Sequence, residues 1–114
     1  MDLSDWRKRI DGLDRKLLAL LNERAECVLR LAPLKRQQSI PIEEPEREAA
    51  IRASLGRHNE GPLNDEAVWR IFESIMAEMK AVQKEETRRV KRRPKREPST
   101  GRSAAKRSSQ ADLK

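Results

Sequence analysis

The sequence has very few of the residues from which nucleophilic and metal-binding sites are usually built. Its 114 residues include one Cys, one His, no Tyr and three other aromatic side chains. One Cys excludes a disulfide within the chain, and the place of Cys27 inside a helical pattern predicts a small buried apolar side chain rather than a nucleophile. The single His58 lies in a polar stretch without Cys or His neighbours. We therefore expect no metal ion and no cofactor.

Long apolar runs are also absent. No run of about 18 apolar residues occurs, and such a run is what a membrane-spanning helix needs. Residues 1–5 show no basic segment leading into an apolar one, which a secretory leader would have. Together with the single Cys, this predicts a cytoplasmic protein in a reducing environment, with no membrane partner.

Positive charge is concentrated at the C-terminal end of the chain. Residues 88–114 hold eleven Lys or Arg and two acidic residues, a net charge of +9. Residues 1–87 hold fifteen basic and seventeen acidic residues, a net charge of −2. Because the end segment has almost no apolar residues, we expect one folded domain over residues 1–87 and a disordered basic tail over residues 88–114. Such a tail is typically a solvated extension, but weak, salt-sensitive contact with nucleic acid or an acidic surface stays open.

Apolar residues at steps of three and four predict a first helix over about residues 4–36. Ser4 is in position to cap its N-terminus, with Asp5 in the first turn. Pro33 should kink the helix or begin to end it. The apolar stripe consists of Trp6, Ile10, Leu13, Leu17, Leu20, Leu21, Val28 and Leu31.

Two shorter helices follow in the sequence. Pro45 suits the first position of a second helix of about 13 residues, which the Gly- and Pro-containing stretch 56–62 ends. Asn64 is in position to cap a third helix of about 22 residues, which should fray after Lys84. No strand pattern occurs, so the predicted fold class is all-α with three helices in the chain.

The lengths of these helices bear on assembly. At about 1.5 Å per residue the first would be roughly 45 Å long, the second roughly 20 Å and the third roughly 33 Å. Neither shorter helix can cover the whole stripe of the first, and a hydrophobic content of 36% leaves little material for a thick core. We therefore expect an intertwined homodimer, in which the long helices of two copies pack together.

Several polar side chains stand on or beside the apolar stripes. Arg24 and Lys35 continue the stripe of the first helix, and Gln83 continues that of the third. Arg47 and Glu48 flank the apolar face of the second helix. A buried charge without a partner is costly, so each of these residues would form an ion pair or extend its head to water. The five together favour a pocket for an anionic ligand.

A longer motif runs through the first helix. Arg7 is followed by Ile-x-x-Leu-Asp at residues 10–14 and by a Leu-rich turn that ends in Arg24. This motif resembles the opening helix of the all-α chorismate mutase family. The resemblance continues through Lys35, residues 45–48 and Gln83, and covers about residues 4–84. It implies a small helical homodimer that converts chorismate to prephenate in the biosynthesis of Phe and Tyr.

The resemblance also implies which residues bind the substrate. Arg24 and Arg47 would bind its two carboxylates, and Arg7 would reach in from the other subunit. Lys35 and Gln83 would face the ether oxygen, where negative charge grows as the C–O bond breaks.

The ring hydroxyl of the substrate would have its own contacts. Glu48 would accept a hydrogen bond from it, and Glu44 would contribute near it, mainly through its backbone. The reaction is an intramolecular rearrangement that needs no nucleophile, metal ion or proton transfer, which suits the residues of this chain.

Two alternatives stay open from the sequence. The isochorismate-pyruvate lyases resemble the same family and use a similar cationic pocket. A non-catalytic helical dimer that presents a nucleic-acid-binding tail would also fit the charge distribution, but it would need neither Lys35 nor Gln83 on an apolar stripe.

Overall fold

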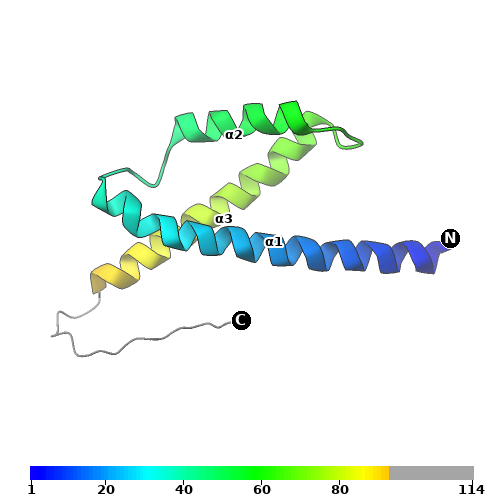
Figure 1. Cartoon of the computed structure of the whole chain (residues 1–114), viewed down its shortest axis with the longest axis horizontal. Helices are drawn as coiled ribbons and strands as arrows, with labels where there is room; N and C mark the ends of the chain where they lie inside the picture. Colours follow the sequence, from blue (N-terminus) through cyan, green and yellow to red (C-terminus); the bar gives the residue numbers. More distant parts are fainter. Residues whose placement is uncertain (93–114) are drawn as a thin grey trace.

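A computed structural model describes residues 1–92 of the chain as three helices and no strand. They are α1 (Leu3–Gln37), α2 (Pro45–His58) and α3 (Asp65–Arg92) (Figure 1). The predicted fold class, all-α with one long and two shorter helices, is confirmed. No helix within residues 1–92 is both long and apolar enough to cross a membrane.

α1 begins before the predicted cap. Asp2, not Ser4, is the N-cap: its Oδ1 accepts a hydrogen bond from the Asp5 N–H at 2.9 Å, and Asp5 Oδ2 accepts one from the Asp2 N–H at 3.2 Å. This reciprocal arrangement satisfies two N–H groups that the first turn would otherwise leave unpaired. At its other end α1 continues for one turn past Pro33 and ends at Gln37.

α2 and α3 begin where the sequence predicts. Pro45 is the first residue of α2, and Asn64 Oδ1 accepts a hydrogen bond from the Ala67 N–H at 2.8 Å in the first turn of α3. α3 is 28 residues long and runs to Arg92, well past the predicted fraying point. The first five residues of the expected tail are therefore helical. Residues 93–114 lie outside the described residues, and the division of the chain after residue 87 stays a prediction.

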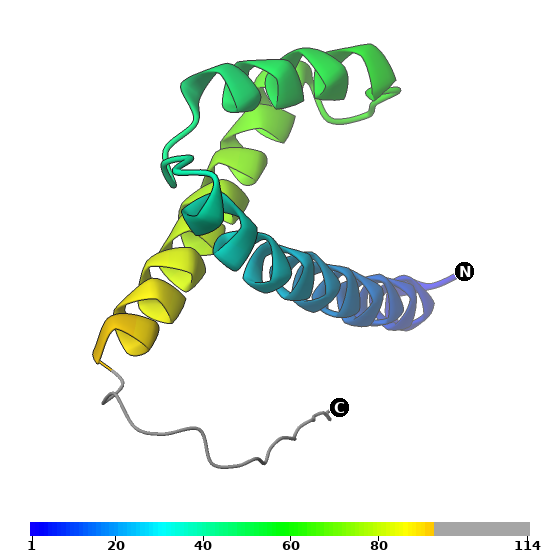
Figure 2. The same cartoon turned by 60° about the vertical axis from the view of Figure 1, so that its left-hand side comes forward.

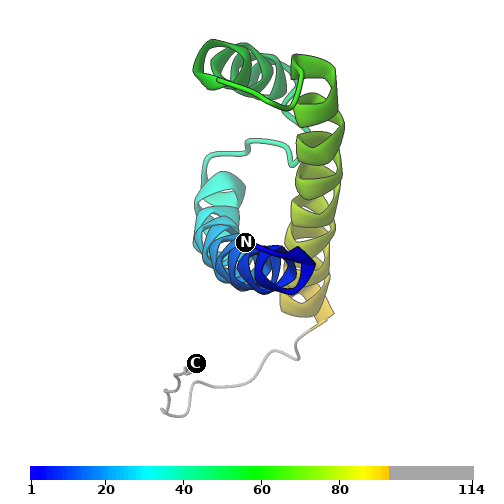
Figure 3. The same cartoon turned by 90° about the vertical axis from the view of Figure 1, so that its right-hand side faces the viewer.

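α3 is the element on which the other two helices pack. The C-terminal half of α1 crosses α3, and α2 packs against the N-terminal half of α3 (Figures 1 and 2). α1 and α2 lie on the same side of α3 (Figure 3). The buried apolar residues are at the crossing of α1 and α3: Val28, Ala32, Met76 and Met79. This small core fixes α1 against α3, whereas α2 contributes no buried residue to it.

The N-terminal half of α1 extends away from both other helices (Figure 1, blue). Its apolar side chains are exposed in the single chain: Trp6 is 51% exposed, Ile10 53% and Leu17 56%. Burial of such a stripe is worth about 25 cal/mol per Å² of apolar surface, and these residues do not obtain it within residues 1–92 of one chain.

Candidate active site

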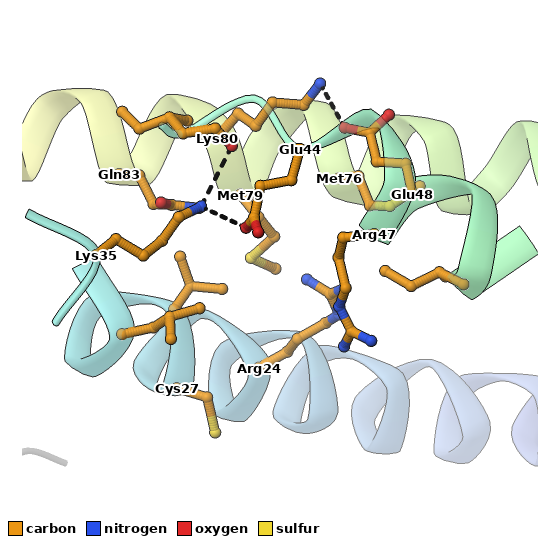
Figure 4. Close-up of a pocket in the computed structure, with 14 residues that line it drawn as sticks. Arg24, Cys27, Lys35, Glu44, Arg47, Glu48, Met76, Met79, Lys80 and Gln83 are labelled. Atoms are coloured by element: carbon orange, nitrogen blue, oxygen red, sulfur yellow. Dashed lines mark hydrogen bonds and ion pairs between the residues drawn. The ribbon is translucent and has the colours of Figure 1, made fainter. Parts of the chain in front are cut away.

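A cavity of about 390 Å³ opens where the three helices meet (Figure 4). α1, α2, α3 and the connector between α1 and α2 all contribute side chains to its wall. One part of the wall is apolar and comes from the core at the α1–α3 crossing. The other part carries the ionisable and amide side chains Arg24, Lys35, Glu44, Arg47, Glu48, Lys80 and Gln83. These include four cations and two carboxylates, a formal charge of +2.

Six of the seven site residues predicted from the sequence line this one cavity, and Arg7 does not. Arg7 is on the far end of α1, seventeen residues before Arg24, which is about 25 Å along a helix. No side chain spans that distance. Arg7 therefore has no route to the cavity of its own chain.

Lys35 and Gln83 form the buried end of the pocket, where 5% of Lys35 and 7% of Gln83 is exposed. Lys35 Nζ lies 2.8 Å from Glu44 Oε2 and donates a hydrogen bond to the Ile42 carbonyl oxygen at 3.3 Å. An ammonium group has three N–H donors, so these contacts leave one for a ligand. α1 presents Lys35 in this position although Pro33 lies two residues before it.

Gln83 is unusual because it is buried and incompletely bonded. Its Oε1 has no hydrogen-bond partner among the described residues. Leaving a buried polar atom unpaired costs about 1–3 kcal/mol, so such atoms in native proteins usually mark a place where a ligand or a water molecule binds. A half turn of the amide exchanges Oε1 and Nε2, so the same position can also present a donor.

Arg24 and Arg47 line the wider part of the pocket and point toward one another across it (Figure 4). Arg24 is half-buried on α1, and Arg47 is exposed on the first turn of α2. Within residues 1–92 neither guanidinium forms an ion pair. Two adjacent guanidinium groups without carboxylate partners are well suited to bind an anion with two carboxylates, each through a bidentate contact.

Lys80 is a cation of the pocket that the sequence did not predict. Its Nζ lies 2.8 Å from Glu48 Oε2 on α2 and 2.9 Å from Glu43 Oε1 on the connector. The contacts with Glu48 and Glu43 raise the pKa of Lys80, and hydrogen bonding to Lys80 lowers the pKa of Glu43. Lys80 follows Met79 at the edge of the apolar stripe of α3, where a Lys is ordinarily a solvated surface residue. The signal that could have found it is its spacing of three from Gln83, which places both on one helix face.

Cys27 is exposed in the single chain and lines the pocket, so its prediction as a buried apolar residue is wrong. The helical pattern gave its secondary structure correctly but not its burial. The resemblance implies that Glu44 acts mainly through its backbone, and in the structure its carboxylate binds Lys35.

The chain is similar to known proteins over the region that builds this pocket. Residues 6–84 match the sequence model of a family described as chorismate mutase type II. The chain is 40% identical over 86 residues to the bifunctional chorismate mutase/prephenate dehydratase of Pseudomonas aeruginosa, a match that covers 71% of this chain and 24% of that protein. It is 36% identical over 87 residues to the chorismate mutase of Methanocaldococcus jannaschii, a match that covers 73% of this chain and 85% of that protein. The chain thus spans about a quarter of the length of the bifunctional relative.

Solved structures show the same fold. Chorismate mutase (form II) from Thermus thermophilus superposes with a TM-score of 0.70 at 29% sequence identity, over 72% of this chain and 93% of that chain. Chorismate mutase from Helicobacter pylori in complex with prephenate superposes with a TM-score of 0.70 at 30% identity, over 75% of this chain and 93% of that chain.

Proposed function

Because the chain belongs to the chorismate mutase type II family, we propose that it catalyses the rearrangement of chorismate to prephenate. In this reaction the ether C–O bond of chorismate breaks while a C–C bond forms in the same cyclic transition state. No atom leaves and no proton is transferred. The task of the protein is to fold a flexible dianion into the reactive shape and to stabilise the oxygen that gains negative charge.

One observation carries this proposal: a single pocket combines two arginines without ion-pair partners in residues 1–92 and a buried end formed by Lys35 and Gln83. Arg24 and Arg47 bind the two carboxylates of the substrate. The formal charge of +2 on the pocket wall matches the charge of −2 on chorismate.

Lys35 and Gln83 act on the ether oxygen. The remaining N–H donor of Lys35 and the Gln83 amide both lie at the buried end, where low solvent exposure strengthens each contact. As the C–O bond lengthens, charge on the ether oxygen increases, so these contacts stabilise the transition state more than the bound substrate. Loss of one such donor typically costs about a hundredfold or more in rate.

The catalytic unit is a homodimer. The exposed apolar stripe on the N-terminal half of α1 would pack against a second copy, which buries the side chains that one chain leaves in solvent. Arg7 from the second copy would then complete the carboxylate-binding end of the pocket. The distance of about 25 Å along α1 makes this the route by which Arg7 can reach a pocket.

The test is an assay with chorismate and isochorismate in parallel, with identification of the products. We expect loss of chorismate with formation of prephenate. Release of pyruvate from isochorismate as the dominant activity would instead favour a lyase of the same fold. Turnover of neither substrate by the dimeric protein would contradict the proposal and would favour a non-catalytic helical dimer.

A further inference from the structure

Lys80 connects three elements of the pocket at one nitrogen atom. It extends from α3, its Nζ contacts Glu48 Oε2 on α2 at 2.8 Å, and it contacts Glu43 Oε1 on the connector at 2.9 Å. The Lys80 side chain is 24% exposed and that of Glu48 is 31% exposed, so both are largely withdrawn from solvent. Lys80 also lines the pocket itself.

The contact with Lys80 engages only one oxygen of the Glu48 carboxylate. The second oxygen stays available to a ligand in the pocket. The contact also fixes the carboxylate on the α3 side of the pocket, whereas the Arg47 guanidinium lies on the other side, toward α1 (Figure 4). Glu48 has no ion pair with either pocket arginine within the described residues.

Removal of Lys80 would leave the Glu48 carboxylate without a cation partner, in a pocket that also holds two guanidinium groups without ion-pair partners in residues 1–92. A carboxylate on a flexible side chain would then form an ion pair with one of them, since nothing else in the described pocket would hold it back. That pairing would neutralise a cation that the substrate needs, and it would withdraw Glu48 from the ring hydroxyl.

We infer that Lys80 is a positioning residue for the proposed mutase reaction, which holds Glu48 ready for the ring hydroxyl and apart from Arg24 and Arg47. The inference rests on the proposed function. It predicts that Lys80 acts on turnover through Glu48 and not through its second contact, Glu43.

The test is a double-mutant cycle measured as kcat/KM for chorismate. Lys80→Met should lower kcat/KM by about tenfold, the scale of coupling between residues in contact. Most of the loss should be a higher KM, because an arginine becomes neutralised. Lys80→Met added to Glu48→Gln should cost less than about twofold further, since an uncharged amide at that position has no reason to pair with an arginine.

Three further variants separate positioning from structure. Lys80→Arg can bind both carboxylates and should restore kcat/KM to within about threefold of wild type. Glu43→Gln breaks the connector contact alone and should leave kcat/KM within about twofold. Lys84→Met is the matched control, because Lys84 is an exposed Lys one turn further along α3 with no ion pair within residues 1–92. It should behave as wild type.

The outcomes are distinguishable. A wild-type protein that turns over chorismate, together with a Lys80→Met variant within twofold of it, would overturn this inference alone. The inference would also be overturned if Lys80→Met lowered kcat/KM by the same factor in the Glu48→Gln background. It would be overturned as well if Glu43→Gln alone lowered kcat/KM by that factor. An inactive wild-type protein would overturn the proposed function as well. If Lys80→Met does not fold, as judged by its thermal melt, the cycle is run with Lys80→Gln, which keeps a polar side chain of similar length.

Discussion

Replacement of Arg24 by Leu distinguishes a binding residue from a structural one. Arg24 lies on the apolar stripe of α1 between Leu20 and Val28, yet it lines the pocket and has no ion pair within residues 1–92. If its role is to bind substrate, the free protein holds a cation without a partner. Arg24→Leu then strands no acidic residue and places an apolar side chain on an apolar stripe.

The two magnitudes follow from these contacts. Removal of a residue from a buried ion pair costs about 3–5 kcal/mol, but no such pair is broken here, so stability should be unchanged or should rise by up to about 1 kcal/mol. On activity, a bidentate contact consists of two hydrogen bonds to a charged group, each worth about 1.5–3 kcal/mol. The loss of about 3–6 kcal/mol corresponds to about 10²–10⁴-fold in kcat/KM at about 1.4 kcal/mol per factor of ten.

The assay combines a denaturant or thermal melt with chorismate kinetics on the same preparation. Arg36→Leu is a matched control on the same helix, because Arg36 Nη1 binds Glu86 Oε1 at 2.6 Å and Thr87 Oγ1 at 3.2 Å and lies outside the pocket. It should show the opposite pattern: a lower melting temperature and normal kcat/KM for the folded protein.

One result would refute this reasoning. If Arg24→Leu lowers stability by several kcal/mol while its folded fraction keeps normal kcat/KM, Arg24 is a structural residue. The view of the pocket as a dianion site would then lose one of its two carboxylate contacts.

Sedimentation at micromolar concentration should give twice the chain mass, and a mixture of Arg7→Ala and Arg24→Ala chains should regain activity as heterodimers form; heterodimers without recovery would exclude a role for Arg7 across the interface. A chain that ends at Arg92 should keep turnover within about twofold at moderate salt, and a tenfold loss would show that residues 93–114 contribute to the site. Lys80 lowers the pKa of Glu43, so the contact stabilises the fold above the unfolded pKa of about 4.3 and is lost as pH falls through the lower folded value; wild type and Glu43→Gln should therefore differ in melting temperature at pH 6, and the difference should shrink as the pH is lowered through the folded pKa of Glu43.

The sequence was sufficient for the elements that follow from periodicity. Apolar residues at steps of three and four form one face of an α-helix and do not fit a strand, so all three helices could be predicted. The Asn64 cap and the helix start at Pro45 could be predicted as well. The predicted N-cap of α1 was wrong because Ser4 and Asp2 are both good cap residues. Only the two reciprocal hydrogen bonds between Asp2 and Asp5 decide between them.

The length of α3 could not be predicted because the contacts near its C-terminal end are made with α1. Arg36 from α1 binds Glu86 and Thr87, which lie beyond the predicted fraying point. Helical periodicity contains no information about such a contact between residues 50 positions apart. The ion pairs of Lys80 could not be predicted for the same reason, since its partners are on two other elements.

The lysines and the arginines of the pocket differ in their ion pairing. Both lysines, Lys35 and Lys80, are paired with carboxylates, whereas both arginines are without ion-pair partners in the described part of the chain. An ammonium is a compact, strongly hydrated charge, so a partly buried Lys is stabilised by a carboxylate that replaces the water it has lost. A guanidinium is more weakly hydrated and keeps its charge without a partner. An arginine without an ion-pair partner therefore costs less free energy in the unliganded protein than a lysine would. A dianionic ligand gains most binding energy from these two arginines, because no carboxylate of the described residues competes for them.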